Sequence, residues 1–516
     1  MAKVTSLLVT SHGNYFPYLG FPQNELLRLQ AESRVEQHQR ESLGWDTAFR
    51  AAERFSDGKP CCKGEGAGHR TKIYTEEEGT FNKCYWIQVA GLDKQWVVRF
   101  PLLGKMSDQT TIRKLRSEVA TLRFLGEKTT VPVPKVIGYG EGDSELPPFM
   151  IMENIAGMRM AIALGRDIPV SIFNKIFKQL AAIQLELLSH PANRIGMLDI
   201  SDAAEESEVP QPTLGPYSID VVEREIDGVC STRPEPFISS HDYYRFKSSV
   251  WKEQLELQQN AILDARDGRR QALNESILRD CFNKMALPDD KTQFYLSHPD
   301  FHGSNVILDR SFNVVGIIDW EGACFLPLAS SCIPLRCLFL FPLNRIQPNS
   351  PYYTEFESKT KRYIKILSEV EKTSPNSIKI SELMRNYVQD KSFFLIRGLD
   401  DVRYLDEVLW QHLAPMLYPE LKERISKVIL EKKQEKAEEI NDGGKAIALA
   451  VDDVLRVFAG EQVESEPLRK QEIDDWVKRR IQDSKDYDRA LAKYLKRKQG
   501  EDSGEIFSER SKSNGA

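Results

Sequence analysis

The residues with the clearest chemical potential lie in the stretch 296–320. His298, Asp300 and Asn305 come first, and Asp319 follows after a predicted hairpin. One carboxylate can accept the proton of a substrate hydroxyl, while an amide oxygen and a second carboxylate are hard ligands that suit Mg²⁺. A metal held in this way binds nucleotide phosphates and neutralises their charge as a phosphoryl group moves. The stretch therefore indicates phosphoryl-transfer chemistry.

Short elements must position these side chains. Residues 306–308 and 314–318 are predicted strands that form the hairpin before Asp319. Upstream, the β-rich runs 83–90 and 95–100 predict a second hairpin. Apolar residues at helical spacing predict a helix over 107–126, with a Ser or Asp cap at its start.

The remaining pattern predicts two lobes. The extended segment 131–139 and the short apolar run 149–153 complete a small sheet with one helix, and the chain then becomes mainly helical. We therefore expect an α+β fold, with a small sheet-plus-helix N-lobe and a larger, mainly helical C-lobe. The expected divisions are an N-terminal extension at 1–69, an N-lobe at 70–155, a C-lobe at 156–430 with an insertion at about 200–290, and a charged helical tail at 431–516 with a disordered end.

The motif HPDFHGSN followed by IIDWE resembles the catalytic and metal-binding loops of the aminoglycoside phosphotransferase and choline kinase families, which have a protein-kinase-like fold. His298, Asp300 and Asn305 stand at the kinase spacing H-x-D-x-x-x-x-N. The segments EGTFNKCY and FMIMENIAG are similar to the nucleotide-covering turn and the hinge of these families. The resemblance covers about residues 70–420 and is nearest to fungal phosphotransferase-family proteins.

The resemblance implies a role for each matching residue. Asp300 is the implied catalytic base, Asn305 and Asp319 are the implied Mg²⁺ ligands, and His298 is expected to hold the loop in place. Glu118 is expected to pair with the phosphate-binding cation Arg99. The other implied nucleotide contacts are Gly79, Phe81 and Asn82 over the phosphates, and Met152, Glu153 and Ile155 at the adenine hinge.

Three positions depart from the family pattern. Arg99 stands where the third strand normally carries Lys, and its planar fork differs in geometry from an ammonium. The phosphate turn has a single Gly instead of G-x-G-x-x-G. The Gly-Asp-Pro of bacterial members is replaced by ACFLPLAS, so antibiotic contacts are not expected to transfer to this chain.

The leading hypothesis is an ATP- and Mg²⁺-dependent transfer of a γ-phosphoryl group to a hydroxyl or amine of a small-molecule acceptor. Three alternatives remain at this point. One is a catalytically weak or inactive kinase-like binding or scaffold protein, which the departures favour. Another is a protein Ser/Thr kinase, although recognisable D-F-G and A-P-E segments are missing from the sequence. The third is a zinc or iron hydrolase that uses His298, Asp300, His302 and Asp319.

The composition and net charge limit the classes of binding partner that we expect. The chain has 516 residues, of which 41% are hydrophobic and 28% charged, and its net charge is −6. Such a chain can build a large core and lacks the strong positive field of a dedicated nucleic-acid binder. We expect no nucleic-acid partner and no membrane span, and no oligomeric state follows from the sequence. A cytoplasmic location is expected, with a mitochondrial location as the alternative, although residues 1–10 lack a strong presequence pattern.

Overall fold

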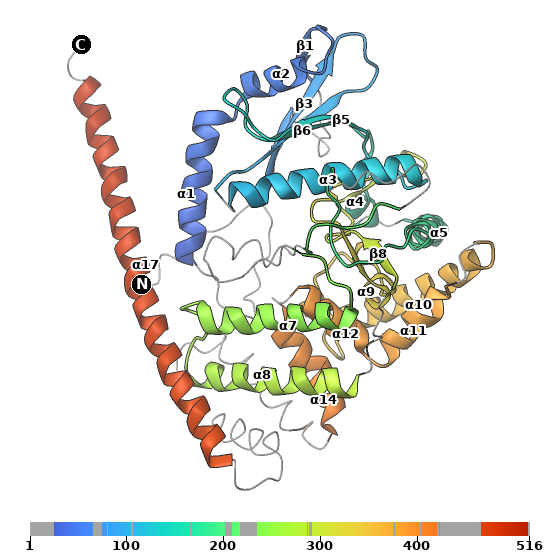
Figure 1. The fold of residues 1–516 in the computed structure, drawn as a ribbon, viewed down its shortest axis with the longest axis vertical. Helices are drawn as coiled ribbons and strands as arrows, with labels where there is room; N and C mark the ends of the chain where they lie inside the picture. The colour runs from blue at the N-terminus through green and yellow to red at the C-terminus, as the bar shows by residue number, and fades with distance from the viewer. Residues whose placement is uncertain are drawn as a thin grey trace.

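A computed structural model gives the fold of the protein (Figure 1). The structure describes residues 25–64, 75–79, 81–104, 107–165, 168–201, 209–216, 235–285, 287, 292–374, 378–401, 404–419, 423 and 466–513. Within the expected insertion at 200–290, residues 202–208, 217–234, 286 and 288–290 lie outside the described residues, as does the whole segment 431–465.

The N-lobe is built on one antiparallel sheet with strand order β1-β3-β4-β6-β5, and β2 pairs with the first part of β3. β-branched and aromatic residues dominate its central strands, which favours extended backbone. The strands are β1 (Cys61–Lys63), β2 (Glu76–Glu78), β3 (Asn82–Val89), β4 (Trp96–Pro101), β5 (Val136–Gly140) and β6 (Phe149–Glu153).

Helices cover both faces of this sheet. On one face, α2 (Trp45–Glu53) packs its alanines against inward side chains such as Tyr85 and Val98. On the other face, α3 (Asp108–Lys128) packs against side chains such as Val97. The sequence predicted a small sheet with a single helix, whereas the structure adds the helix α2 and the short strand β1 to the N-lobe. Both elements precede residue 70, so this lobe includes part of the segment expected to be an extension.

The C-lobe carries two small sheets that frame the candidate catalytic segment. β7 (Met158–Arg159), β9 (Val306–Leu308) and β10 (Val314–Ile317) form one sheet in the order β10-β9-β7. β8 (Phe294–Ser297) pairs with β11 (Cys324–Pro327) in the other. The loop after β8 and the turn after β10 are therefore held by separate strand pairs that belong to one core.

Helices make up the rest of the C-lobe. α5 packs against α10, where Phe177 and Tyr363 meet edge to face with ring centroids 5.7 Å apart. The helices are α4 (Met160–Leu164), α5 (Val170–Leu187), α7 (Ser240–Leu257), α8 (Ala265–Lys284), α9 (Leu328–Ser331), η1 (Arg336–Leu338), η2 (Leu343–Arg345), α10 (Pro351–Glu371), α11 (Ile380–Gln389), α12 (Ser392–Asp400), α13 (Leu405–Val408), η4 (Leu409–Leu413) and α14 (Ala414–Leu417).

A long helix, α17 (Glu466–Ser513), runs along one side of the molecule (Figure 1). It contacts α8 in the C-lobe and α1 (Glu25–Ser42) near the N-terminal end. The disordered end expected for the charged tail stays a prediction. In the part of the chain that the structure describes, no helix is long and apolar enough to cross a membrane.

The predicted fold class is confirmed. The protein is α+β, with a small lobe of sheet and helix and a larger, mainly helical lobe (Figure 1). The predicted strands and the helix over 107–126 lie within a few residues of their predicted bounds. These elements depend on local periodicity, and local periodicity can be read from sequence.

Candidate active site

The loop after β8 is held in shape by His298. The backbone N–H of Asp300 donates to His298 Nδ1 (3.1 Å), so the other ring nitrogen, Nε2, carries the proton and donates to the carbonyl of Ile318 (3.0 Å). The N–H of Ile318 in turn donates to the carbonyl of Asn305 (2.9 Å). His298 therefore fastens the end of β10 to the loop that carries Asp300 and Asn305.

His298 is buried against aromatic rings. Its ring lies 5.4 Å from that of Phe301, roughly parallel to it, and 4.8 Å from that of Trp320. Burial lowers the pKa of His298 to about 4, because the charged imidazolium would lose its hydration there. The side chain is thus neutral at neutral pH, as its two hydrogen bonds require.

Asp300 faces two possible cations. Its Oδ1 accepts from Arg336 Nη1 (2.8 Å) and its Oδ2 lies 3.1 Å from His302 Nε2. Burial tends to raise the pKa of Asp300, but the hydrogen bond from His302 and the charges of Arg336 and His302 outweigh burial and lower the pKa to about 2. Asp300 is therefore an ionised hydrogen-bond acceptor at physiological pH.

The two candidate metal ligands, Asn305 and Asp319, flank the hydrogen bond between the N–H of Ile318 and the carbonyl of Asn305. Asn305 donates through Nδ2 to the carbonyl of Asp300 (3.0 Å), which leaves its amide oxygen to act as a ligand. Asp319 directly follows Ile318, adopts a left-handed φ of 67° and keeps 44% of its side chain exposed. Asp and Asn adopt this conformation more readily than most residues.

The charge around Asp319 suits a divalent cation. Partial burial is the main cause that raises the pKa of Asp319; the charge of Arg99 lowers the pKa, and the carboxylates of Glu321 and Asp300 raise it further. A bound cation would offset this crowding of negative charge. Among the described residues, no three His, Cys, Asp or Glu side chains are grouped to hold a metal. With Asn305 and Asp319 as its protein ligands, a Mg²⁺ ion would have to take its other ligands from phosphates and water.

Arg99 joins the two lobes. It lies on β4, in the interior of the N-lobe sheet, and forms a buried ion pair with Glu118 of α3. Glu118 is only 1% exposed, so it is not a solvated helix charge. Arg99 also reaches Asp319 (3.4 Å) and Glu321 (3.7 Å) in the C-lobe. The predicted pair of Arg99 and Glu118 therefore exists, and it faces the candidate metal ligand.

Glu321 and Lys114 complete this cluster. Glu321 pairs with Lys114 of α3 and accepts from Asn82 Nδ2 (2.8 Å). Lys114 also lies 4.9 Å from the ring of Phe81. Burial tends to raise the pKa of Glu321, but Lys114 and Arg99 lower it to about 2. Two residues expected over the phosphates therefore border a small pocket shared with two cations and a carboxylate.

The other predicted nucleotide contacts lie on or next to the strands β2 and β6 of the N-lobe sheet. Gly79 is exposed in a turn whose N–H donates to the carbonyl of Asn82 (2.8 Å). Met152 is buried at the end of β6. The N–H of Glu153 donates to the carbonyl of Lys135 (2.9 Å), and its carboxylate pairs with Lys94.

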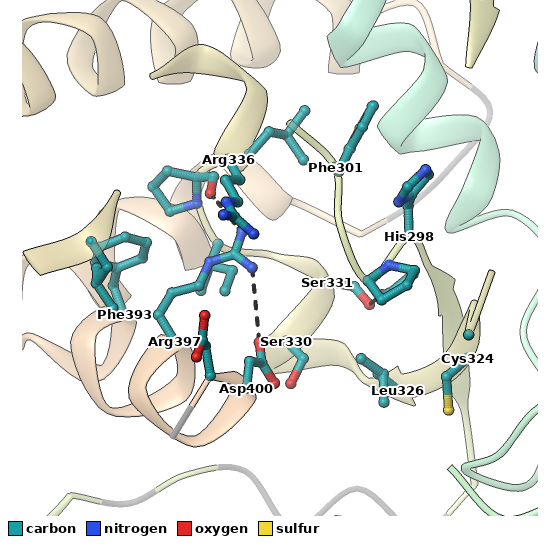
Figure 2. Close-up of a pocket in the computed structure, with 18 of the residues that line it drawn as sticks. His298, Phe301, Cys324, Leu326, Ser330, Ser331, Arg336, Phe393, Arg397 and Asp400 are labelled. Carbon is teal, nitrogen blue, oxygen red and sulfur yellow. Dashed lines mark hydrogen bonds and ion pairs between the residues drawn. The ribbon is translucent and has the colours of Figure 1, made fainter. Parts of the chain in front are cut away.

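A cavity of about 190 Å³ opens beside the Asp300 loop (Figure 2). His298, Phe301 and Arg336 form part of its wall next to Asp300. Figure 2 shows Arg336, Arg397 and Asp400 gathered on one side, with His298, Leu326 and Cys324 on the other. The cavity is therefore placed to hold a molecule whose end reaches Asp300.

Sequence reasoning missed three of these residues. Lys114 follows an ordinary helical pattern, Arg336 lies 36 residues after Asp300 in an irregular segment, and Glu321 was quoted only as part of the IIDWE motif. For Lys114, the one available signal was a polar residue on the apolar face of the predicted helix. Cys324, three residues after Glu321, is buried, and burial raises its pKa far above the usual range. It is therefore an unreactive thiol under ordinary conditions.

Residues 77–330 match the model of a family described as the phosphotransferase enzyme family. The match confirms the resemblance indicated by the catalytic motifs and supports phosphotransferase chemistry in general. It spans the N-lobe sheet except β1, together with both candidate loops and the start of the C-lobe helices that follow them.

Curated relatives include "Altered inheritance of mitochondria protein 9, mitochondrial" from two yeasts. The Clavispora lusitaniae protein is 35% identical over 154 residues, which cover 28% of this chain and 25% of that protein. The protein of Saccharomyces cerevisiae S288c is 24% identical over 305 residues, which cover 50% of this chain and 48% of that protein. The matches thus span from about a quarter to about half of the relatives' length.

Similar solved structures include two aminoglycoside phosphotransferases. One, a ternary complex with streptomycin and ATP, is 13% identical, with a TM-score of 0.39 over 72% of this chain and 92% of that one. The other, a complex with GDP and kanamycin, is 17% identical, with a TM-score of 0.33 over 66% of this chain and 91% of that one.

Proposed function

We propose that the protein transfers the γ-phosphoryl group of ATP, with Mg²⁺, to a hydroxyl or amine of a small molecule. One observation carries the proposal: Ile318 is hydrogen bonded in both directions to the Asp300 loop, which holds Asp319 beside Asn305 and turned toward Arg99. The proposed base, the two proposed oxygen ligands and the proposed phosphate-binding cation would then act together where the two lobes meet. These are the parts that phosphoryl transfer needs.

Asp300 is proposed to orient the acceptor hydroxyl and to accept its proton as the oxygen–phosphorus bond forms and the bond to the leaving ADP oxygen breaks. With a pKa of about 2, Asp300 is too weak a base to remove the proton early. Proton transfer is therefore expected late in the step, and most of the contribution comes from positioning. Asn305 and Asp319 would hold Mg²⁺, which when bound neutralises charge on the phosphates.

The nucleotide is proposed to lie between β4 and the Asp300 loop. Arg99 would bind phosphate oxygens, because its fork can serve a carboxylate and a phosphate together while Glu118 fixes its position. Gly79, Phe81 and Asn82 are proposed to cover the phosphates, with Met152, Glu153 and Ile155 at the adenine. Among the described residues the N–H of Ile155 has no backbone partner, which suits a contact with the adenine edge.

A specific observation favours a second candidate function, that of a kinase-like binding protein with little activity. Arg99 already contacts the three carboxylates of Glu118, Asp319 and Glu321, and Glu321 also engages Lys114. A triphosphate has to compete with Glu321 for both cations. Weak nucleotide binding is the expected result if this competition dominates.

The test is a metabolite-library screen for Mg²⁺-dependent ATP consumption, with generic protein substrates as a separate arm. Asp300→Asn should lower turnover on the order of 10²–10⁴-fold, because it removes the proton acceptor. Asp475→Asn, at an exposed position on α17, is the matched control and should leave turnover unchanged. Full turnover by Asp300→Asn would rule out the proposed role.

Thermal unfolding with Mg-ATP separates the enzyme from a protein that does not bind nucleotide. Binding to the native state alone stabilises it by RT ln(1 + [L]/Kd), about 2.7 kcal/mol at 100 times Kd. A mitochondrial location is also proposed, because the curated relatives carry that word in their names. Imaging of the tagged full-length protein in cells tests the location.

A further inference from the structure

The cavity beside Asp300 has a largely apolar lining. Side chains such as Leu296, Phe301, Leu326, Phe339 and Phe393 contribute to its wall. A strongly hydrated, many-hydroxyl molecule would lose hydration here without enough polar partners to replace it. An occupant of this cavity therefore needs an apolar body.

Charge enters the cavity mainly as cations. Lys247, Arg336 and Arg397 line it, together with two acids, Asp400 and Asp401. Arg336 is held by Asp300 at the end of the cavity next to the candidate catalytic loop. Lys247 and Arg397 are therefore the cations available to recognise an occupant of the cavity.

The ammonium group of Lys247 is buried, and its positive charge is only weakly compensated by neighbouring groups. It lies on α7 and is 3% exposed. Its Nζ donates to the backbone carbonyl of Asp400 at 3.5 Å, the outer limit of a hydrogen bond. No carboxylate of the described residues lies within 4.0 Å of Nζ. A buried ammonium without a close anion is costly, so an anionic occupant would stabilise it.

Arg397 is also loosely paired. Its Nη2 donates to the carbonyl of Pro334 (3.0 Å), and its Nη1 lies 3.8 Å from Asp400 Oδ2. Asp400 therefore contacts both Arg397 and, through its backbone carbonyl, Lys247. The two cations share this neighbour, which places them at the same part of the cavity.

We propose that this cavity binds an acceptor with an apolar body and an anionic group, either a carboxylate or a phosphate. The anion lies at Lys247 and Arg397, and the acceptor hydroxyl reaches Asp300. The hydroxyls of Ser330 and Ser331 line the same cavity and can donate to the anion. The assignment rests on the proposed function for the role of Asp300, but the binding of the anionic group can be measured without turnover.

The experiment compares four probes that share one apolar chain and differ in head group: octanoate, octyl phosphate, octanol and octylamine. Calorimetric titration into the full-length protein without nucleotide should give octanoate or octyl phosphate a Kd at least tenfold lower than that of octanol, with octylamine the weakest. The ranking of the two anions shows which source of negative charge the site prefers.

Lys247→Met removes the charge and keeps much of the side-chain volume. The substitution should raise the Kd of the tighter-binding anion about tenfold and leave the Kd of octanol within twofold of the wild-type value. Lys252→Met, on the same helix but 56% exposed at its side chain, is the matched control and should change neither. If Lys247→Met does not fold, the order of the four Kd values with the wild-type protein tests the inference. Lys247→Arg, which keeps the charge, should show the same order.

The inference is overturned if octylamine binds tightest, if no probe binds, or if folded Lys247→Met keeps the octanoate and octyl phosphate affinities. Mg-ATP is tested on the same sample by thermal shift. Nucleotide binding without anion preference refutes only the acceptor assignment, whereas anion preference without nucleotide binding or ATP consumption refutes only the phosphotransferase proposal.

Discussion

At the scale of single residues, the environment of Asp300 decides what it can do. Arg336 and His302 hold the carboxylate from two directions and keep it ionised. An acceptor hydroxyl must therefore approach a carboxylate of fixed orientation. Arg336 acts through Asp300 and is a positioning residue.

Replacing Arg336 tests this positioning. Arg336→Met should lower kcat about 10- to 100-fold, because a misplaced catalytic group costs rate even when substrates bind. Arg336→Lys should give an intermediate rate, since it keeps the charge and loses the planar fork. The Kd of Mg-ATP should stay unchanged in both. Steady-state kinetics with the acceptor from the screen, alongside nucleotide titration, separate the two effects; an unchanged kcat would contradict the prediction.

His298 makes stability depend on pH. Its folded pKa of about 4 is below the unfolded value of about 6.5, so the unfolded chain binds the proton more readily. The contribution of neutral His298 to the free energy of unfolding is fully present above about pH 6.5. It falls by about 3 kcal/mol as the pH drops to 4. Urea unfolding at several pH values measures the decline.

The variant His298→Asn should be less stable at pH 7 and show a shallower loss of stability between pH 6.5 and 4. His241→Asn, at an exposed position, is the control and should follow the wild-type slope. Equal slopes for His298→Asn and the wild type would show that His298 does not titrate as a buried neutral group.

At the scale of elements, the pair of Arg99 and Glu118 fastens α3 to the N-lobe sheet. The helix begins at a Ser107 cap, whose hydroxyl oxygen accepts from the N–H of Thr110 (3.2 Å), and buries an apolar face that includes Val119. Glu118 interrupts that face with a buried charge, and its ion-pair partner among the described residues is Arg99. The position of α3 and the orientation of the phosphate-binding cation are therefore set together.

Glu118→Gln should lower the free energy of unfolding by about 3 kcal/mol, because it removes one partner of a buried ion pair. It should also reduce the thermal shift produced by Mg-ATP, since Arg99 loses its fixed position. Glu127→Gln, at an exposed position on α3, is the matched control and should change both by little. A stable Glu118→Gln protein with an undiminished ATP shift would show that the pair has no orienting role.

At the scale of the whole molecule, α17 connects parts that are far apart in sequence. The hydroxyl of Tyr487 accepts from the N–H of Leu26 in α1 (3.0 Å), and Arg480 donates to the backbone carbonyl of Gln258 at the end of α7. Val477 packs beside Gly268 of α8 and is 3% exposed. The long helix is thus part of the packed molecule along these contacts.

Val477→Asp should lower the free energy of unfolding by roughly 3 kcal/mol, because it places an unpaired carboxylate in the contact between α17 and α8. Gln482→Asp introduces the same side chain at an exposed position of α17 and serves as the control. Chemical denaturation of both variants checks the prediction. Equal stability of the two would indicate that α17 does not pack on α8 in solution.

The sequence by itself was enough for the elements whose pattern is local. The strands around Arg99, the helix that bears Glu118 and the hairpin before Asp319 follow from apolar spacing, turn residues and a helix cap. The spacing of His298, Asp300 and Asn305 also singled out the candidate catalytic loop. These features involve residues that are neighbours along the chain, so their spacing carries the information.

Only the tertiary structure decided which distant residues meet. The contacts of Arg336 with Asp300, of Lys114 with Glu321, and of Lys247 with the cavity join segments separated by long stretches of chain. The packing of α2 on the second face of the sheet is of the same kind. Ion pairs and buried contacts of this sort depend on how the helices and strands pack, and apolar periodicity indicates which face of an element is buried without specifying its partner.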